Sequence, residues 1–316
     1  MTAVTLTTIR QAHERIRPHV HRTPVLSSTL LNQLVGTELL FKCENFQKVG
    51  AFKARGACNA VFSLSEEQAR RGVVTHSSGN HGAALAWAAR KRGIPATVVV
   101  PENAPPPKKR AIVGYGARVV ECAATVQARE ETTRRLIEQH GLELVHPYDD
   151  DRVIAGQGTA AVELLEDAER LDVVIAPTGG GGLLSGTALA VRGLRPEVAV
   201  YGAEPRGADD AFRSFTTGVL VRQATPNTVC DGLRTTLSER TFAILREHVR
   251  GIALSGDDAV VRAMRQIWEY LKIVVEPSSC PPLGAILEGT LDVRGKRVGI
   301  ILTGGNVDLD KLPWHR

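Results

Sequence analysis

The stretch LDVVIAPTGGGGLLSGTALAVRGL, residues 171–194, runs through a short apolar strand, a glycine-rich turn and a segment with helical spacing of apolar residues. The stretch VVTHSSGNHGAALAWAARKRG, residues 73–93, repeats this order. Short β-branched strands that alternate with helices are typical of parallel sheets joined by right-handed crossovers. The sequence therefore predicts an α/β protein in which helices cover both faces of parallel sheets.

Further apolar runs are predicted to be strands of the same kind, with a long helix among them. The runs are ATVVVP (96–101), ARVVEC (117–122), VAVYGAEP (198–205) and RVGIILTGGN (297–306), and the helix is expected over 125–140. Ligands of parallel sheets bind beyond the carboxyl ends of the strands. Glycine-rich turns follow several of these ends, so we expect the functional site there.

The composition limits the class of protein. A chain of 316 residues is near or beyond the size at which one hydrophobic core stops growing, so two lobes are expected. The net charge is +5, but the basic residues are scattered and few aromatic residues accompany them, which argues against nucleic-acid binding. The sequence has neither an apolar run long enough to span a bilayer nor the apolar core of a signal peptide. Five cysteines without a CxxC pair favour reduced thiols, so we expect a cytoplasmic protein that binds no membrane.

Four consecutive glycines, Gly179–Gly182, stand between a predicted strand and a predicted helix. Backbone N–H groups of such a turn converge with those of the helix N-terminus and suit a phosphate. A turn that is merely tight needs fewer glycines. The Walker pattern is absent, and so is the acidic residue expected about 20 residues after a dinucleotide fingerprint. We therefore expect the phosphate of a ligand other than ATP or NAD.

Polar side chains crowd the turn that follows the strand VVTH. Ser77, Ser78, Asn80 and His81 stand there, whereas a helix N-cap needs only one such side chain. Hydroxyl, amide and free N–H groups at a helix N-terminus suit a carboxylate or an oxyanion.

Lys53 lies between Gly50 and Gly56, while the other lysines lie beside charged or surface-like residues. A lysine, a phosphate nest and a carboxylate nest together suggest pyridoxal 5'-phosphate (PLP). This cofactor needs a lysine for a Schiff base, a phosphate site and a partner for its ring nitrogen. Thr303 offers a hydroxyl for that nitrogen, although by itself it would pass for a satisfied turn hydroxyl.

From about residue 9 to residue 314 the sequence resembles the fold-type II PLP enzymes of the serine/threonine dehydratase and serine racemase group, whose fold is like that of tryptophan synthase β. The motifs that carry this resemblance, in the order of the family, are FQKVGAFKARGA (46–57), SSGNHG (77–82), VIAGQGT (153–159), GGGGLLSG (179–186), GAEPRGADD (202–210), EPSS (276–279) and TGGNVD (303–308). The resemblance implies a large PLP-binding domain over 1–70 and 150–316, a small domain over 71–149 that closes over an amino-acid substrate, and a homodimer.

The resemblance also implies cofactor contacts. Lys53 would form the Schiff base, Phe52 would pack on the ring and Asn80 would bind the 3-hydroxyl. Thr303 would face the ring nitrogen. The backbone N–H groups that would bind the phosphate belong to Gly179, Gly180, Gly181, Gly182 and Leu183.

Substrate and metal contacts are implied in the same way. The residues that would bracket the substrate carboxylate are Ser77, Ser78, Asn80 and His81. Ser78 would be the acid/base on the face opposite Lys53. Glu204, the Ala208 carbonyl and Asp210 would bind a divalent cation, and oxygen ligands suit Mg²⁺, Mn²⁺ or Ca²⁺. Without the resemblance, an acidic surface loop would be the better interpretation of that segment.

Arg129 bears on the choice of substrate. It matches an arginine of serine racemases and hydroxyaspartate dehydratases, and a guanidinium suits a second carboxylate by bidentate pairing. The alternative is an ordinary arginine of a helix surface. The segment EPSS and the ending GGNVDLDKLPW also look like those of bacterial β-hydroxyaspartate dehydratases. Cys280, Pro281 and Pro282 depart from the small residues of many members, and Tyr148 stands where animal serine racemases have an asparagine.

Three interpretations remain open. The first is a dehydratase, or ammonia-lyase, of a β-hydroxy amino acid, with 3-hydroxyaspartate favoured over serine and threonine. The second is a serine or aspartate racemase with elimination as a side reaction, because Lys53 and Ser78 are both present. The third is a non-catalytic PLP-binding protein, which the presence of Lys53, Ser78 and Thr303 together argues against.

Overall fold

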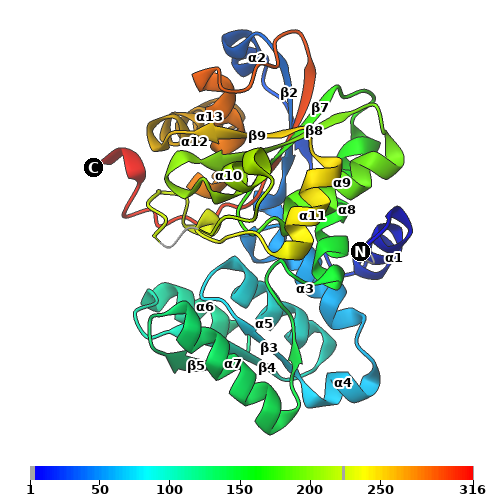
Figure 1. The fold of residues 1–316 in the computed structure, drawn as a ribbon, viewed down its shortest axis with the longest axis vertical. Coiled ribbons are helices and arrows are strands. Elements are labelled where there is room, and N and C mark those ends of the chain that lie inside the picture. The colour runs from blue at the N-terminus through cyan, green and yellow to red at the C-terminus, as the bar shows by residue number, and fades with distance from the viewer. Residues whose placement is uncertain (1–3, 223–224, 316) are drawn as a thin grey trace.

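The computed structural model describes residues 4–222 and 225–315. It contains two sheets, which lie one beyond the other along the long axis of the molecule (Figure 1). The larger sheet has the strand order β1-β2-β10-β7-β8-β9. Its strands are β1 (Val25–Leu26), β2 (Glu38–Cys43), β7 (Val173–Pro177), β8 (Ala199–Pro205), β9 (Gly251–Ser255) and β10 (Arg297–Leu302). All neighbours pair in parallel except the two-residue β1, which is antiparallel to β2.

The smaller sheet has the order β5-β4-β3-β6 and is parallel throughout. Its strands are β3 (Val73–His76), β4 (Ala96–Pro101), β5 (Arg118–Cys122) and β6 (Glu143–Leu144). The whole sheet is therefore built from chain that lies between β2 and β7 of the larger one. The predicted α/β fold with parallel sheets is confirmed, and the predicted runs at 96–101, 117–122, 198–205 and 297–306 each contain a strand.

Helices connect the strands. The α-helices are α1 (Leu6–Ile16), α2 (Thr29–Val35), α3 (Lys53–Phe62), α4 (Glu66–Arg71), α5 (Asn80–Arg92), α6 (Pro106–Gly114), α7 (Val126–His140), α8 (Asp151–Asp167), α9 (Gly182–Leu194), α10 (Asp210–Thr217), α11 (Glu239–His248), α12 (Asp257–Leu271) and α13 (Pro281–Glu288). The 3₁₀ helices are η1 (Glu44–Phe46), η2 (Lys48–Gly50), η3 (Arg206–Ala208), η4 (Asp231–Leu233), η5 (Pro277–Ser279) and η6 (Pro313–His315). In the described part of the chain, each of these helices is too short or too polar to cross a membrane.

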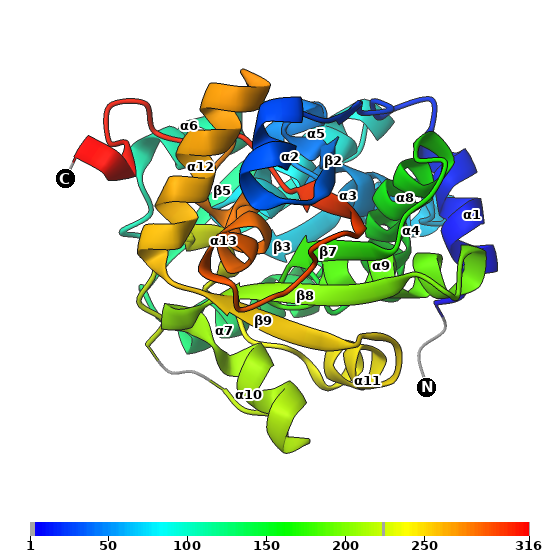
Figure 2. The same ribbon diagram turned by 90° about the horizontal axis from the view of Figure 1, so that it is seen from above.

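Alternation along the strands decides which helices cover which face. In β7, Val173 and Ile175 pack with the cluster of α12 and α13, whereas Val174 and Ala176 pack with that of α8 and α9. Figure 2 shows these two helix pairs on opposite sides of the large sheet. Because side chains of a strand alternate between faces, a run of β-branched residues without polar breaks is what a sheet covered on both sides requires.

The predicted long helix is α7, and its boundaries follow from its caps. The Thr125 side chain accepts from the backbone N–H of Ala128, and Gly141 ends the helix in the left-handed region. Only one face of α7 reaches the core, through Thr133 and Leu136. This face packs against β3 and β4 of the small sheet, and the opposite face stays polar.

Candidate active site

Lys53 is the first residue of α3 and lies where the two sheets meet. Its Nζ donates to the carbonyl oxygen of Pro147 at 2.7 Å and lies 5.1 Å from the centre of the Phe52 ring. The side chain is partly open to solvent, but protein surrounds most of it, and this burial lowers the pKa of the amine to about 8. In the described ranges no carboxylate lies within 4 Å of the amine, so Lys53 forms no ion pair. An unpaired amine of lowered pKa can act as a nucleophile or a base.

The loop that carries Lys53 is joined to the loop after β10. The Phe52 N–H donates to the Thr303 carbonyl at 2.9 Å, and the Gly305 N–H donates to the Gly50 carbonyl at 3.0 Å. Ala51 and Gly304 form an isolated antiparallel bridge between these two contacts. Lys53 and Thr303 are 250 residues apart in sequence, and this short ribbon brings them to one site.

The glycine loop closes another side of the site. All four of its glycines are buried, between β7 and α9. A Cβ on Gly180 would lie 2.4 Å from the Tyr148 ring, and Gly181 has φ +85°, a conformation that favours glycine. Because the first intrahelical bond of α9 runs from Ser185 to Gly181, the N–H groups of the first turn are left for a ligand.

The turn after β3 holds the predicted carboxylate-binding residues together. Ser77, Ser78 and Asn80 are half-buried there, and α5 begins at Asn80. The buried ring of His81 is turned away, because its Nε2–H donates to the Val145 carbonyl at 3.0 Å. Burial, together with the charge of Lys53, holds the pKa of His81 well below its usual range. The neutral ring offers no second N–H, so only the backbone amide of His81 is suited to an anion.

Thr303 is one of a pair of buried hydroxyls. Its Oγ1 lies 3.0 Å from the Oγ of Ser279, which in turn accepts from the Gly304 N–H at 3.0 Å. Both side chains are almost fully buried at the carboxyl end of β10. A ring nitrogen beside this pair would meet a hydroxyl and not a carboxylate.

Two histidines of this site were missed by sequence reasoning, and Tyr148 was noted there only as a departure from animal serine racemases. The rings of His76 and His146 lie 5.2 Å apart and those of His146 and Tyr148 lie 4.7 Å apart, each pair edge to face. Burial, then the charge of His76, lowers the pKa of His146 to about 4, and its Nδ1 accepts from the Asp149 N–H at 2.9 Å. The three rings form a row from His76, the last residue of β3, to Tyr148, which lies against Gly180 of the glycine loop. The segment HPY after β6 carries no glycine or motif that would have revealed it.

Arg129 stands in the first turns of α7, which packs against β3. The Arg129 side chain is half-buried. The pKa of His76, the last residue of β3, is lowered first by the burial of His76 itself and then by the charge of Arg129. Its guanidinium engages no hydrogen bond or ion pair with the residues that the structure describes. Arg129 is therefore an unpaired cation near the end of the turn that holds Ser77 and Ser78.

Glu204 and Asp210 form a second buried polar group, at the carboxyl end of β8. Glu204 accepts from the N–H groups of Ala211 at 3.2 Å and Phe212 at 2.9 Å, and Ala208 is buried beside them. Burial and the neighbouring Asp210 hold the pKa of Glu204 well above its usual range, and burial raises that of Asp210 to about 6. One oxygen of Asp210 is buried without a hydrogen-bond partner. In the part of the chain that the structure describes, no group of three or more His, Cys, Asp or Glu side chains is placed to hold a metal ion. The orphan oxygen of Asp210 and the carboxyl of Glu204 are the side-chain oxygens that a hard divalent cation could use here.

The segment Cys280-Pro281-Pro282 begins α13 directly behind Ser279. All three residues are buried, and proline in the first turn suits a helix start because the missing N–H would have no intrahelical partner. The Cys280 thiol contacts the Glu276 carbonyl at 3.5 Å, and burial raises its pKa. This departure from small residues thus follows directly on Ser279, the partner of the Thr303 hydroxyl.

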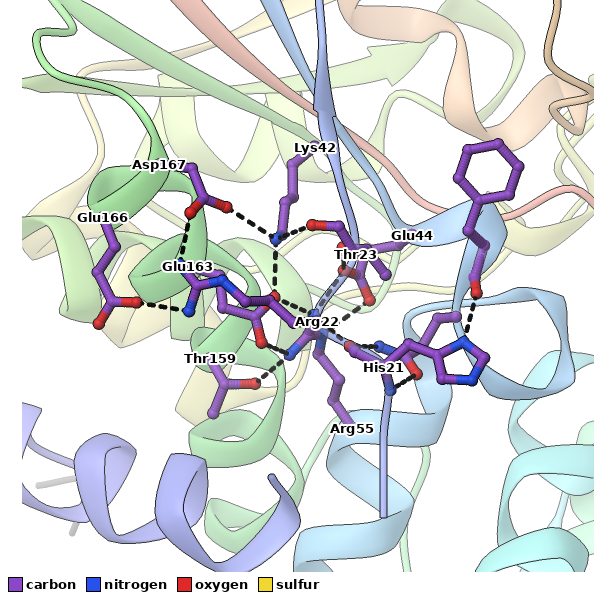
Figure 3. Close-up of polar contacts among 12 residues, drawn as sticks. His21, Arg22, Thr23, Lys42, Glu44, Arg55, Thr159, Glu163, Glu166 and Asp167 are labelled. Carbon is purple, nitrogen blue, oxygen red and sulfur yellow. Dashed lines mark hydrogen bonds and ion pairs between the residues drawn. The ribbon is translucent and has the colours of Figure 1, made fainter. Parts of the chain in front are cut away.

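A buried ionic cluster anchors α3 beneath Lys53 (Figure 3). The guanidinium of Arg55 contacts both oxygens of Glu44 at 2.7 and 2.8 Å and both oxygens of Glu163 at 2.8 and 2.7 Å. Lys42 Nζ reaches Glu163 at 2.7 Å and the Thr23 carbonyl at 2.6 Å. Although burial opposes its ionisation, Glu163 has a pKa lowered to about 2 by Arg55 and Lys42. Lys53 therefore starts a helix whose first turn is fixed by Arg55 to η1 and α8.

The groups at the meeting of the sheets fit PLP. A buried amine of lowered pKa, a loop too tight for any Cβ before free helix amides, and a pair of hydroxyls correspond to its aldehyde, phosphate and ring nitrogen. PLP was predicted from the same residues.

Comparisons with known proteins agree with this assignment. Residues 16–304 match the family model described as pyridoxal-phosphate dependent enzyme. The chain is 53% identical over 304 residues to the β-hydroxyaspartate dehydratase of Paracoccus denitrificans, covering 96% of each chain. It is 47% identical over 304 residues to the L-threo-3-hydroxyaspartate ammonia-lyase of Saccharomyces cerevisiae, covering 96% of this chain and 93% of that one. The crystal structure of serine racemase from Dictyostelium discoideum is 52% identical, covers 97% of this chain and 99% of its own, and superposes with a TM-score of 0.93. The chain therefore belongs to the fold-type II family of pyridoxal-phosphate-dependent enzymes.

Proposed function

We propose that this enzyme removes the β-hydroxyl group of 3-hydroxyaspartate and yields an oxo acid and ammonia. The relatives from Paracoccus denitrificans and Saccharomyces cerevisiae, which bear the names of such enzymes, support this proposal at 53% and 47% identity. Serine and threonine are alternative substrates of the same reaction.

The observation that carries the choice of substrate is the unpaired Arg129. An amino acid bound by the turn at Ser77–Asn80 directs its side chain away from its α-carboxylate, and a dicarboxylic substrate then needs a cation. Arg129 is near enough to lower the pKa of His76, which ends the strand before this turn. We assign the β-carboxylate to Arg129, because a guanidinium pairs with a carboxylate through two parallel hydrogen bonds.

PLP, when bound, makes the α-proton of the substrate acidic by withdrawing electrons from the α-carbon. Lys53 accepts this proton at Nζ, and a pKa of about 8 leaves roughly a tenth of the amine neutral at pH 7, far more than for an ordinary lysine. The helix amides at the start of α5 and the hydroxyls of Ser77 and Ser78 hold the α-carboxylate. The β-hydroxyl leaves as water after it is protonated, and the product hydrolyses to the oxo acid and ammonia.

Thr303 and Ser279 favour elimination over other fates of the substrate. A hydroxyl at the ring nitrogen does not keep that nitrogen protonated as a carboxylate would, so less negative charge is drawn into the ring. Prompt loss of the β leaving group is then the easier route.

Three further assignments belong to this proposal. Glu204, the Ala208 carbonyl and Asp210 bind Mg²⁺, with Mn²⁺ or Ca²⁺ as alternatives, and this cation stabilises the fold without entering the chemistry. Residues 71–149 form a small domain that closes over the substrate bound to the large domain of 1–70 and 150–316. The enzyme acts as a homodimer in the cytoplasm.

Racemisation of serine or aspartate is the second candidate function. It is favoured by one observation, the presence of Lys53 and Ser78 at one site, because two acid/base groups on opposite faces of the α-carbon are what racemisation needs. The relative from Dictyostelium discoideum named serine racemase, at 52% identity, also supports it.

One assay separates the two functions. The enzyme is incubated with each stereoisomer of 3-hydroxyaspartate, and with serine, threonine and aspartate. Oxo acid is then measured, and the remaining amino acid is resolved by chiral chromatography. Fast oxo-acid release from 3-hydroxyaspartate, with little inversion of the remainder, is the expected result. Rapid inversion of serine or aspartate with little oxo acid would select the racemase.

A further inference from the structure

The side-chain amide of Asn80 is held by two residues of the large-sheet part of the chain. Its Nδ2 donates to Glu276 Oε1 at 3.1 Å and Oε2 at 3.2 Å. Its Oδ1 accepts from Asn306 Nδ2 at 3.0 Å, and that same nitrogen donates to the Val49 carbonyl at 2.8 Å. Asn80 itself starts α5 of the small sheet. The contact therefore joins the two sheets beside the entrance to the site.

Glu276 is a buried carboxyl without a cationic partner. It is 5% exposed, and the described residues place no lysine or arginine nitrogen within 4 Å of it. Its backbone is fixed by a hydrogen bond from its N–H to the Gly304 carbonyl at 2.9 Å, on the loop that carries Thr303. The donors that face its oxygens are the Asn80 amide and the backbone N–H of Asn306. Such a group is costly to bury, so its presence in the interior indicates a task other than stability.

We propose that Glu276 is a positioning residue that fixes the orientation of the Asn80 amide, and so determines that an N–H of Asn80 faces the cofactor. The proposal rests on the assignment of Asn80 to the 3-hydroxyl oxygen of PLP. An ionised carboxylate only accepts hydrogen bonds, so it selects the amide orientation with Nδ2 toward Glu276. Asn306 supports the same orientation, because its amide nitrogen only donates. The two oxygens of one carboxylate lie in nearly the same direction from Nδ2, so they share a single N–H of Asn80. The other N–H has no further acceptor among the described residues and is left for the cofactor oxygen.

The strength of the hydrogen bonds between the Asn80 amide and Glu276 depends on the charge of Glu276. A charge-assisted hydrogen bond is roughly twice as strong as a neutral one, and a protonated carboxyl no longer demands a donor. The titratable groups that act on Glu276 are Asp231, Lys108, and the thiols of Cys230 and Cys280. Burial, then the charge of Asp231, raises the pKa of Glu276 to about 7. Above neutral pH, Glu276 is therefore ionised and fixes the orientation of the Asn80 amide. Below neutral pH it is protonated and no longer selects one orientation.

The charges of a surface ion pair act on the pKa of Glu276. Lys108 of α6 donates to Asp231 of η4 at 2.6 Å, and both side chains are exposed. Asp231 raises and Lys108 lowers the pKa of Glu276. Asp231→Asn removes the repulsive charge, so it shifts the titration of Glu276 to lower pH without touching Asn80 or the cofactor.

The test measures PLP binding rather than turnover. Equilibrium dialysis of the holoenzyme gives the Kd of PLP between about pH 6 and about pH 8.5 for the wild type, Glu276→Gln and Asp231→Asn. Gln keeps the shape of Glu276 and one acceptor but cannot be charged. We expect about a tenfold weaker binding for Glu276→Gln at high pH, the size of one charge-assisted hydrogen bond. Lys53 titrates in all three proteins, so the difference from wild type is the quantity that reports on Glu276.

The outcomes are distinct. In support, the wild type gains affinity relative to Glu276→Gln as the pH rises through about 7, and Asp231→Asn moves this gain to lower pH. If Glu276→Gln binds PLP as the wild type does at every pH, the proposal is overturned. A uniform loss of affinity at all pH values, or an unfolded circular dichroism spectrum for Glu276→Gln, would make Glu276 merely structural and overturn it too. None of these measurements uses a substrate, so a failure of the proposed dehydratase activity would not be mistaken for them.

Discussion

The amine of Lys53 donates to the carbonyl of Pro147 at 2.7 Å, although 94 residues separate them. Pro147 follows β6, the last strand of the small sheet, and Lys53 opens the helix that the ionic cluster fixes to the large sheet. The reactive amine therefore touches both parts of the molecule.

Lys53→Ala is expected to abolish both turnover and the covalent PLP adduct that borohydride reduction traps. The reason is that Lys53 combines a pKa of about 8 with a position opposite the glycine loop. Mass spectrometry of a digest should find the reduced adduct on the peptide that contains Lys53. Lys48→Ala, a nearby lysine of η2, is the control and should keep both properties. An adduct on another lysine would refute the assignment.

Arg129→Ala is expected to lower kcat/KM for 3-hydroxyaspartate about 30- to 1000-fold, because a charge-assisted pair in a closed site contributes roughly 2–4 kcal/mol. Serine or threonine turnover should change much less, since these substrates lack the second carboxylate. Lysine at position 129 should restore only part of the rate, because it keeps the charge but loses the planar fork.

Arg134→Ala removes an exposed arginine from the same helix and serves as the control. It should leave the kinetics of both kinds of substrate unchanged. An equal loss for serine and 3-hydroxyaspartate in Arg129→Ala would assign Arg129 a structural part instead of a part in selectivity.

Chelation is expected to lower the melting temperature of the enzyme while leaving its chemistry intact once folded. A cation that binds only the folded chain, at 100 times its Kd, adds about 2.7 kcal/mol to stability. Differential scanning calorimetry with EDTA, followed by Mg²⁺, Mn²⁺ or Ca²⁺, measures the effect. In Asp210→Asn the added cation should no longer raise the melting temperature. Identical melting of the wild type with and without chelator would argue against this site.

Arg55→Met is expected to lower the free energy of unfolding by about 3–5 kcal/mol, because it leaves Glu44 and Glu163 buried without their guanidinium. Arg22→Met, at the half-exposed edge of the same cluster, should cost less than about 1 kcal/mol. Denaturant unfolding compares the two variants.

The cost of Arg55→Met should also depend on pH. Glu163 has a lowered pKa, so its contribution to the free energy of unfolding is full above its ordinary pKa and is lost as the pH falls toward about 2. The penalty of Arg55→Met should therefore shrink in acid, and a penalty that is constant with pH would contradict this account.

The wild type without PLP is expected to lose about 3 kcal/mol of stability relative to Glu276→Gln as the pH rises from about 4.5 to about 8. Glu276 has a raised pKa of about 7, so the folded chain keeps a proton there that the unfolded chain releases. The favourable contribution is present below the unfolded pKa and disappears as the pH passes the folded one. Urea unfolding at a series of pH values measures the difference. Parallel stability profiles for the two proteins would show that Glu276 titrates normally.

Local patterns predicted much of this molecule from sequence. The β-branched runs, the glycine loop and the capped helix at Thr125 depend on neighbours a few residues away, and each is recovered in the structure. The motifs that carry Lys53, Asn80 and Thr303 are also local signals, and the structure brings these residues to the meeting of the two sheets, while their roles toward the cofactor stay predictions.

What could not be predicted depends on contacts between distant segments. Nothing near Glu276 in sequence indicates that it faces Asn80, and nothing near Arg55 indicates that two glutamates surround it. Nothing near His81 indicates that its ring turns toward Val145, a contact that depends on the pairing of β3 with β6 and leaves the His81 backbone N–H for an anion. Burial and tertiary contacts, more than residue type, decide these partners.

β10 lies between β2 and β7 in the large sheet, and this position has a consequence for folding during synthesis on the ribosome. The small sheet needs only residues 73–144 and is complete before half of the chain has been made. The large sheet cannot close until β10, the last strand in sequence, inserts between β2 and β7. Until then β2 and β7 each expose an unpaired apolar edge, the kind of surface on which nascent chains aggregate. Truncated chains that end before residue 297 should therefore depend on chaperones for their solubility, while their small sheet is already formed.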